Sequence, residues 1–295
     1  MMVPVLLPAI GETVTELAGV FNIGIEGIML LSGITAYFVA LATGDIMTGV
    51  ASALFVGAIA ALVTAYCQVT LRVDQVVFGI GMYFFGLALS SFLHVTYSTA
   101  GELGKYTSIP TIRPIDIPLL SELPYVGFLF SQNVMVYLSI VIVGVTWFIL
   151  DKTWIGLKIR AVGQDPAVAD SLGIQIFKYR YVCLVVSGIL AALGGAYLII
   201  ALSGIWIGNI TAGRGFVAFA LLRLGSWRPW RIALASLAYG VLTALQASLQ
   251  VVAPTIPSQL FQILPYVMAI VFLGAAKSWM RERQPRSLGI PYSRE

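Results

Sequence analysis

Glu26 is the residue whose type and position are most unusual in this sequence. It stands in Phe-Asn-Ile-Gly-Ile-Glu-Gly, within a long apolar run. A carboxylate at the centre of a membrane helix costs about 3 kcal/mol on insertion scales, so such a group pairs with a partner or faces water. Asn22 stands four residues earlier and would share a helix face with Glu26. Two interpretations stay open: a hydrogen-bonded staple between helices, or contact with water or a ligand in a pathway.

A second group of residues predicts a short, capped helix between two apolar runs. Asp165 suits the N-cap, Pro166 suits the first helical position, and Gly173 suits the residue just past the end. Val168 and Leu172 then share one face of this helix. Because no membrane would cover that face, we expect a partner protein to bind it. The alternative is that the segment folds back onto the neighbouring helix ends.

The sequence offers no other pattern that commonly carries chemistry. His94 is the only histidine, Cys67 and Cys183 are the only cysteines, and no Gly-x-x-x-x-Gly-Lys-[Ser/Thr] phosphate loop occurs. We therefore expect a chain that is not an enzyme and that binds no metal ion and no cofactor. The net charge of +4 predicts no nucleic-acid partner, because the basic residues stand mainly beside apolar runs.

The elements that position these residues follow from a composition that is 59% hydrophobic and only 10% charged. An ordinary soluble domain has about 25% charged residues. In lipid every backbone donor and acceptor must be paired internally, which leaves helices or closed barrels. The apolar runs have the length of spanning helices and lack the alternation of barrel strands. The sequence thus predicts an all-α, polytopic membrane protein with a single transmembrane domain over residues 1–295.

About eight helices, within a range of eight to ten, are expected to cross the membrane, some of them discontinuous. The predicted spans are Val20–Ala42, Ile46–Leu71, Val76–Tyr97, Val134–Leu150, Tyr181–Ser203, Ile205–Leu224, Ile232–Val252 and Leu260–Ala276. The sixth is the weakest because glycines, Asn209 and Arg214 interrupt it, which favours a broken helix. Residues 1–19 carry Glu12 and Glu16 and are short, so they lie at the interface, pack re-entrantly or add a ninth crossing.

The charge distribution predicts the orientation. If the loops alternate sides, fourteen of the 17 Lys and Arg residues share one side, which the positive-inside rule makes cytoplasmic. We therefore expect a multi-pass protein of the cell inner (plasma) membrane with both termini in the cytoplasm. Residues 98–132, whose four prolines favour an extended path, would form an external loop, and residues 151–180 a cytoplasmic loop. Small residues along 187–196 indicate that the span from Tyr181 lies inside the bundle.

With these motifs the chain resembles the permease subunits of ABC importers for branched-chain amino acids, ribose and nucleosides. It is most similar to the shorter permease of the nucleoside and simple-sugar branch. The segments that carry the resemblance follow the family order through most of the chain: residues 22–27, 75–77, 156–166, 172–174, 212–216 and 265–267. Segment 156–166 is the most specific of them. Tyr83, Arg223 and Arg228 depart from the family pattern.

The resemblance implies a non-catalytic permease that imports nucleosides, while a separate subunit binds and hydrolyses ATP. Import of ribose, another simple sugar or branched-chain amino acids is the alternative. The implied partners are a homologous second permease, an ABC ATPase subunit, an external substrate-binding protein and membrane lipid. An ion-coupled secondary transporter fits less well, because Glu26 is the only carboxylate that qualifies as an intramembrane site for a coupling ion.

Two sites are expected, one formed by polar or amphipathic residues that lipid would penalise and one that the resemblance implies. The residues expected to line the transport pathway are Asn22, Glu26, Gln75 and Tyr83. The residues expected to couple the permease to the ATPase are Arg160, Gly163, Asp165, Pro166, Val168, Ala169, Leu172 and Gly173.

Overall fold

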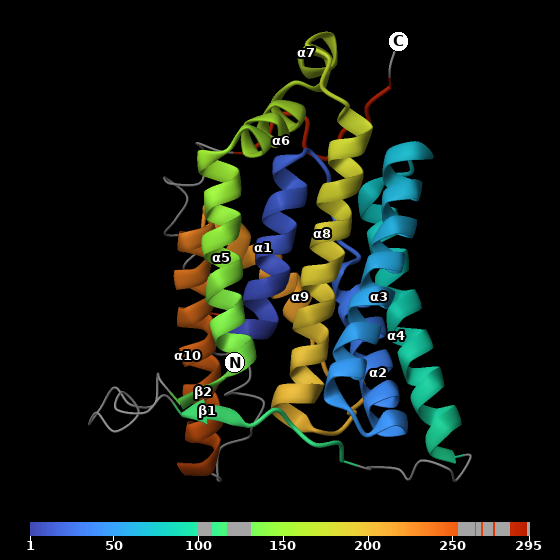
Figure 1. Cartoon of the computed structure of the whole chain (residues 1–295), viewed down its shortest axis with the longest axis vertical. Helices are drawn as coiled ribbons and strands as arrows, with labels where there is room; N and C mark the ends of the chain where they lie inside the picture. Colours follow the sequence, from blue (N-terminus) through green and yellow to red (C-terminus); the bar gives the residue numbers. More distant parts are fainter. Residues whose placement is uncertain are drawn as a thin grey trace.

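A computed structural model of the chain describes residues 1–99, 108–116, 131–252 and 284–293, with the single positions 263, 267 and 274. Its α-helices are α1 (Val3–Leu17), α2 (Ile25–Thr43), α3 (Ile46–Ala65), α4 (Gln75–Thr99), α5 (Val134–Lys152), α6 (Trp154–Gln164), α7 (Pro166–Ser171), α8 (Ile176–Tyr197), α9 (Arg214–Leu224) and α10 (Pro229–Val252). Two π-helical turns, η1 (Tyr66–Thr70) and η3 (Leu198–Ser203), extend α3 and α8. Figure 1 shows the long helices side by side, with α6 and α7 at one end of the bundle.

The helices that could span a membrane agree with most of the predicted spans. Six helices in the described part of the chain are long and apolar enough: Ile25–Thr43, Ile46–Thr70, Gln75–Tyr97, Val134–Lys152, Ile176–Ser203 and Pro229–Gln250. The prediction of an all-α polytopic membrane protein is confirmed. The predicted span Leu260–Ala276 lies outside the described residues, apart from isolated positions.

The span that the sequence marked as weakest is broken in the structure. The backbone turns through residues 204–213, with positive φ at Asn209, Ala212 and Gly213, before α9 begins. The eleven residues of α9 extend only about 16 Å, half the thickness of a hydrocarbon core. The N-terminus of α9 therefore lies within the depth of the bundle, where its free amide groups need partners.

Helix α1 is an internal element of the bundle. All fifteen of its residues are buried. Its beginning lies beside the middle of α10, where a Cβ added at Gly240 would sit 2.9 Å from the Met2 nitrogen. Its end lies against α6, where a Cβ added at Gly163 would sit 2.1 Å from the Leu17 carbonyl oxygen. Figure 1 places residues 284–293 at the α6–α7 end of the bundle and the start of α1 away from that end, and the location of both termini in the cytoplasm stays a prediction.

The small residues of α8 allow its neighbours to approach closely, as predicted. A Cβ added at Gly195 would lie 2.2 Å from the Met29 carbonyl oxygen of α2. One added at Gly188 would lie 2.3 Å from the Ala61 Cβ of α3. Helix α8 is consequently buried in the bundle and packs against α1, α2 and α3.

The two predicted loops contain more regular structure than expected. In residues 98–132, strand β1 (Pro114–Asp116) pairs antiparallel with β2 (Ser131–Asn133). Asn133 then caps α5, because its Oδ1 accepts from the Met135 amide at 3.1 Å. Residues 151–180 are mostly helical, since α6 and α7 occupy the middle of the predicted loop and α8 begins earlier than expected.

Candidate functional site

The short helix predicted between the apolar runs is present as α7. Asp165 is its N-cap, and its Oδ1 accepts from the Val168 amide at 3.1 Å. Pro166 takes the first helical position, where its missing amide hydrogen costs nothing. Gly173 follows the helix with a φ of 77°, a left-handed conformation that glycine adopts without strain. The local chemistry of the sequence is therefore sufficient to define both ends of α7.

The apolar residues of α7 divide between an inner and an outer face. Val168 is 54% exposed and Leu172, which follows the last turn, is 74% exposed. Ala169 is 1% exposed and packs with Val162 and Ile176. Two of the predicted coupling residues thus form an exposed apolar strip, while Ala169 attaches the helix to the bundle.

Helix α6 is held tightly beneath α7. Gly163 faces the last turn of α1, and the distance from its ideal Cβ to the Leu17 carbonyl oxygen leaves no room for a side chain. This predicted coupling residue therefore serves the packing of α6 on α1. Close packing also requires a glycine at Gly215, where an added Cβ would lie 2.6 Å from Glu26 Oε2.

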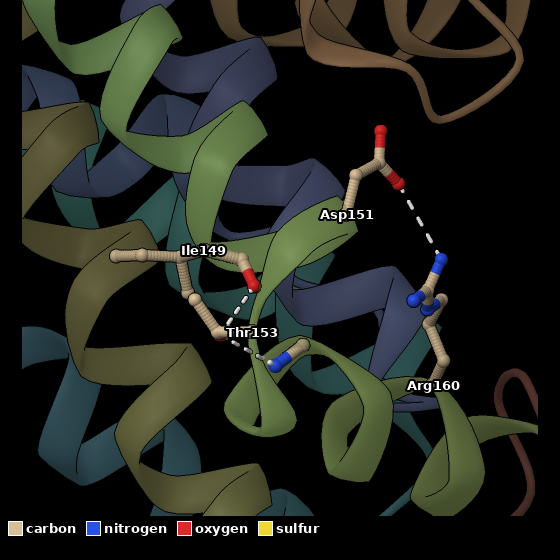
Figure 2. Close-up of polar contacts among 5 residues, drawn as sticks. Ile149, Asp151, Thr153 and Arg160 are labelled. Carbon is tan, nitrogen blue, oxygen red and sulfur yellow. Dashed lines mark hydrogen bonds and ion pairs between the residues drawn. The ribbon is translucent and has the colours of Figure 1, made fainter.

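Figure 2 shows how the end of α5 joins α6. Arg160 of α6 forms an ion pair with Asp151 of α5, with 3.4 Å between Nη1 and Oδ1. The Thr153 hydroxyl donates to the Ile149 carbonyl at 2.7 Å and accepts from the Gly156 amide. A partly exposed ion pair contributes about 1 kcal/mol at most, so Arg160 orients the junction more than it stabilises it.

Glu26 joins the beginning of α2 to the beginning of α9. Its Oε1 accepts from the Thr211 hydroxyl at 2.5 Å and from the Gly213 amide at 2.7 Å, and its Oε2 accepts from the Gly215 amide at 2.5 Å. The side chain is fully buried. The carboxylate thus caps α9 from another helix, where the helix dipole favours a negative charge. This geometry supports the staple interpretation, because both oxygens are already occupied.

Asn22 does not share a helix face with Glu26, because α2 begins only at Ile25. The Asn22 amide donates to Glu12 Oε1 at 2.9 Å, and its side-chain nitrogen donates to the Ser187 hydroxyl at 3.2 Å. Asn22 therefore fixes the turn between α1 and α2 to α8. The sequence predicted a polar pair at positions 22 and 26, and the structure separates the two residues into different clusters.

Gln75 and Tyr83 lie on α4. Gln75 is 3% exposed, and its Oε1 accepts from the Phe21 amide at 2.8 Å. Tyr83 is half-buried, and its ring meets the Phe216 ring of α9 edge-on, with 5.2 Å between centroids. Gln75 thus contacts Phe21 and Tyr83 contacts Phe216, and both of these phenylalanines line the cavity described next.

A cavity of about 310 Å³ opens beside α9. Its lining residues, which we call the aromatic hollow, are Phe21, Ile23, Phe216, Phe219 and Arg223. These residues are absent from the predicted pathway, although Arg223 was expected to depart from the family pattern. The spacing of Phe216, Phe219 and Arg223 along one helix face was a usable signal.

Arg223 is held at the edge of the hollow by an acid and two aromatic rings. Its Nη2 lies 3.6 Å from Glu16 Oε1, and its guanidinium lies 5.8 Å from the Phe21 ring centroid and 5.2 Å from that of Trp227. The Trp227 indole N–H donates to Glu16 Oε2 at 2.8 Å. The Arg223 side chain remains 30% exposed while Glu16 is fully buried. The hollow therefore carries a guanidinium whose charge is balanced by a buried carboxylate.

Comparison with known proteins gives a family and several relatives. The family model described as "Branched-chain amino acid transport system / permease component" matches residues 1–273. A nucleoside ABC transporter permease protein of Lactococcus lactis, NupC, is 32% identical over 98% of this chain and 93% of its own. A guanosine ABC transporter permease protein of Bacillus subtilis, NupQ, is 31% identical over 98% of this chain and 92% of its own.

A third relative has a different substrate in its name. A putative glucose ABC transporter permease protein of Haloferax volcanii, TsgC13, is 35% identical over 82% of this chain and 73% of its own. No solved structure matches the chain. The family match covers all of the helices described above, and the chain belongs to the family of branched-chain amino acid transport system permease components.

Proposed function

We propose that the chain is the permease subunit of an ATP-driven importer that carries nucleosides across the cell membrane. The relatives NupC and NupQ, which match 98% of the chain, support this substrate class. The observation that carries the proposal is the aromatic hollow, because its composition suits a neutral ligand with a planar ring.

The hollow offers two kinds of contact to a nucleobase. Phe21, Phe216 and Phe219 present aromatic rings, and stacking of one base on an aromatic side chain contributes about 1–3 kcal/mol. Arg223 offers a flat guanidinium that stacks on a base or donates to its carbonyl oxygen. Because Glu16 balances the charge of Arg223, the hollow favours a neutral nucleoside over an anionic nucleotide.

The four residues expected in the pathway take two roles in this proposal. Tyr83, which touches Phe216, extends the aromatic wall towards the substrate. Asn22, Glu26 and Gln75 hold the backbone around the hollow, because Asn22 bonds the α1–α2 turn to α8, Glu26 accepts from α9 and Gln75 accepts from the Phe21 amide. Substrate contact is thus proposed for Tyr83 and support for the other three.

The exposed strip of α7 supports an ATPase partner at the α6–α7 end. Val168 and Leu172 would dock in that subunit, which would bind and hydrolyse ATP in place of this chain. This end would face the cytoplasm, because fourteen of the 17 basic residues belong to loops on that side of the predicted topology. A homologous permease would complete the pathway, and an external binding protein would deliver the substrate.

A simple sugar is the second candidate substrate. The relative TsgC13, named for glucose, favours it. A sugar is also neutral and packs on aromatic rings, but it has no planar ring for the Arg223 guanidinium to stack on. Uptake of labelled guanosine, challenged with excess unlabelled uridine, glucose or ribose, separates the two substrates.

The test uses cells that express the permease pair, the ATPase and the binding protein together. We expect the cells to take up guanosine, and we expect uridine but not glucose to inhibit this uptake. Val168→Glu or Leu172→Glu should abolish the uptake, and the ATPase should no longer co-purify with these variants. The control Ala167→Glu adds the same charge about 100° away round the same helix. Uptake of glucose in place of guanosine, or full ATPase retention in both strip variants, would refute the proposal.

A cysteine-labelling experiment tests the orientation. A cysteine replacing Ser108 is expected to react with a membrane-impermeant reagent from outside the cell, whereas one replacing Gln175 reacts only after permeabilisation. Both positions are exposed. Labelling of Gln175→Cys in intact cells would reverse the orientation.

A further inference from the structure

Residues 284–293 cross the α6–α7 end of the bundle, far in sequence from every element that they touch. Figure 1 shows this segment, in red, beside α6 and near α7. The residues that touch it belong to the α1–α2 turn, α6, α7 and α8. We call residues 284–293 the strap.

The first half of the strap is bonded to α6 and to the α1–α2 turn. The Ser287 amide donates to the Gly163 carbonyl at 3.0 Å, and the Ser287 hydroxyl donates to the same oxygen at 2.7 Å. The Gly289 amide donates to the Gly19 carbonyl at 3.2 Å. Ser287 is 7% exposed. The two bonds of Ser287 are therefore shielded from water, in which they would be weaker.

The second half of the strap is bonded to α7 and α8. The Tyr292 hydroxyl donates to Asp170 Oδ2 of α7 at 3.1 Å, and its ring lies 6.2 Å from the Phe177 ring of α8. Arg180, which is 2% exposed, donates from Nη1 to the Ile290 carbonyl at 3.3 Å. Tyr292 thus packs beside the helix whose outer face carries the exposed apolar strip.

The middle of the strap touches the wall of the aromatic hollow. A Cβ added at Gly289 would lie 3.0 Å from the Phe21 ring, so the strap backbone and that ring are in contact. Gly289 also has a φ of 81°, which a residue with a side chain rarely adopts. One short segment therefore contacts α7 through Tyr292 and the hollow through Gly289.

We infer that the strap links movement of α7 to the position of Phe21 in the aromatic hollow, with Tyr292 as the positioning residue at α7. The inference rests on the proposed function for what α7 and the hollow bind. A displacement of α7 shifts Asp170, Tyr292 follows through its hydrogen bond, and the few residues between Tyr292 and Gly289 pass the shift to Phe21. Such a contiguous set of contacts is a physical route for coupling, which a mutational test must establish.

The first experiment measures transport per ATP hydrolysed in liposomes that contain the complete transporter. Tyr292→Phe removes one hydroxyl, and we expect the ratio of nucleoside imported to ATP hydrolysed to fall about fivefold, the factor that one hydrogen bond typically contributes to an equilibrium. The matched control is Tyr181→Phe, which loses a hydroxyl bonded to Thr70 outside the strap. The ATPase should co-purify with both variants. An unchanged ratio in Tyr292→Phe would overturn the inference.

The second experiment needs neither substrate nor ATPase. Hydrogen exchange of the purified chain in lipid nanodiscs reports on α7 and on the amides of Phe21 and Asn22. We expect Tyr292→Phe to speed exchange in both places, and Gly289→Ala, at the other contact, to do the same. If Tyr292→Phe loosens α7 and leaves residues 21 and 22 unchanged, the strap does not connect the two sites. A wild-type transporter that imports no nucleoside would refute the proposed function alone, because the exchange result still decides the inference.

Discussion

Glu26 and Glu16 are both completely buried, yet their partners differ in kind. Glu26 accepts from two backbone amides at the beginning of α9 and from the Thr211 hydroxyl. Within the described part of the chain, the partners of the Glu16 carboxylate are side chains, the Trp227 indole and the Arg223 guanidinium. The first carboxylate holds the backbone of a broken helix, and the second balances a cation that lines a cavity.

The difference shows which buried acid can take part in movement. Backbone amides in the first turn of α9 cannot leave Glu26 unless the helix unwinds or moves as a whole. The side chains around Glu16 can change rotamer, and Arg223 already reaches the open hollow with 30% of its side chain exposed. We therefore interpret the Glu26 cluster as a fixed joint and the Glu16 cluster as the adjustable one.

Removal of the Glu26 carboxylate should have the largest effect on stability, because it tests whether the Glu26 cluster is a fixed joint. Glu26→Ala removes the acceptor of two buried donors, at Thr211 and Gly215, and of the partly buried Gly213 amide, which we expect to destabilise the fold by roughly 3 kcal/mol or more. Thermal unfolding of the purified chain in detergent measures the loss. A variant that unfolds at the wild-type temperature and still imports nucleosides would show that the joint is dispensable.

The close approach at Gly215 gives the next largest effect. A Cβ there would lie 2.6 Å from Glu26 Oε2 and 2.9 Å from Glu26 Cα. We expect Gly215→Ala to destabilise by about 1–3 kcal/mol through overpacking. Gly144→Ala is the control, because a Cβ in the middle of α5 meets no atom within 4 Å. Equal unfolding temperatures for the two variants would show that Gly215 is not closely packed against Glu26.

Glu16→Gln tests whether the Glu16 cluster contributes less to stability than the Glu26 cluster. Glutamine can still accept from Trp227, and the remaining Arg223 is partly exposed to solvent, so we expect only about 1 kcal/mol of destabilisation. The hollow would then carry an unbalanced positive charge, and we expect slower uptake of neutral nucleosides by a folded permease. Loss of folded protein as severe as that of Glu26→Ala would mean that the two acids play the same role.

Arg223→Lys should have the smallest effect on stability. Lysine keeps the positive charge near Glu16, so the change in unfolding free energy should stay below about 1 kcal/mol. It removes the flat guanidinium over Phe21 and Trp227, which a compact ammonium cannot replace. We expect nucleoside uptake to fall severalfold in an assay with saturating binding protein. Unaltered uptake would exclude the guanidinium from substrate contact.

The parts of the site that sequence analysis predicted well depend on residues close together in the chain. Asp165, Pro166 and Gly173 define the ends of α7 through caps that reach only three or four residues. The break before α9 was likewise predicted from local glycines and polar residues. The roles assigned to these residues in coupling stay predictions, which the strip and strap variants test.

The parts that sequence analysis missed depend on contacts across the bundle. The aromatic hollow combines residues 21 and 23 with residues 216–223, and the strap brings Tyr292 to Asp170. The spacing of Asn22 and Glu26 predicted a shared helix face, but a turn separates them and sends each to a different helix. No local pattern records which distant donor a buried carboxylate will meet.

Residues that are close together in the chain are sufficient to predict a bundle of membrane helices and the capped helix α7. Apolar length and local capping act over one helix at a time, so they can be read in order along the chain. Three other features become visible in the folded bundle alone: Glu26 caps α9, Glu16 balances Arg223 and α1 is internal. Those outcomes depend on which helices pack together, because a buried polar group is stabilised only where the fold brings a partner to it.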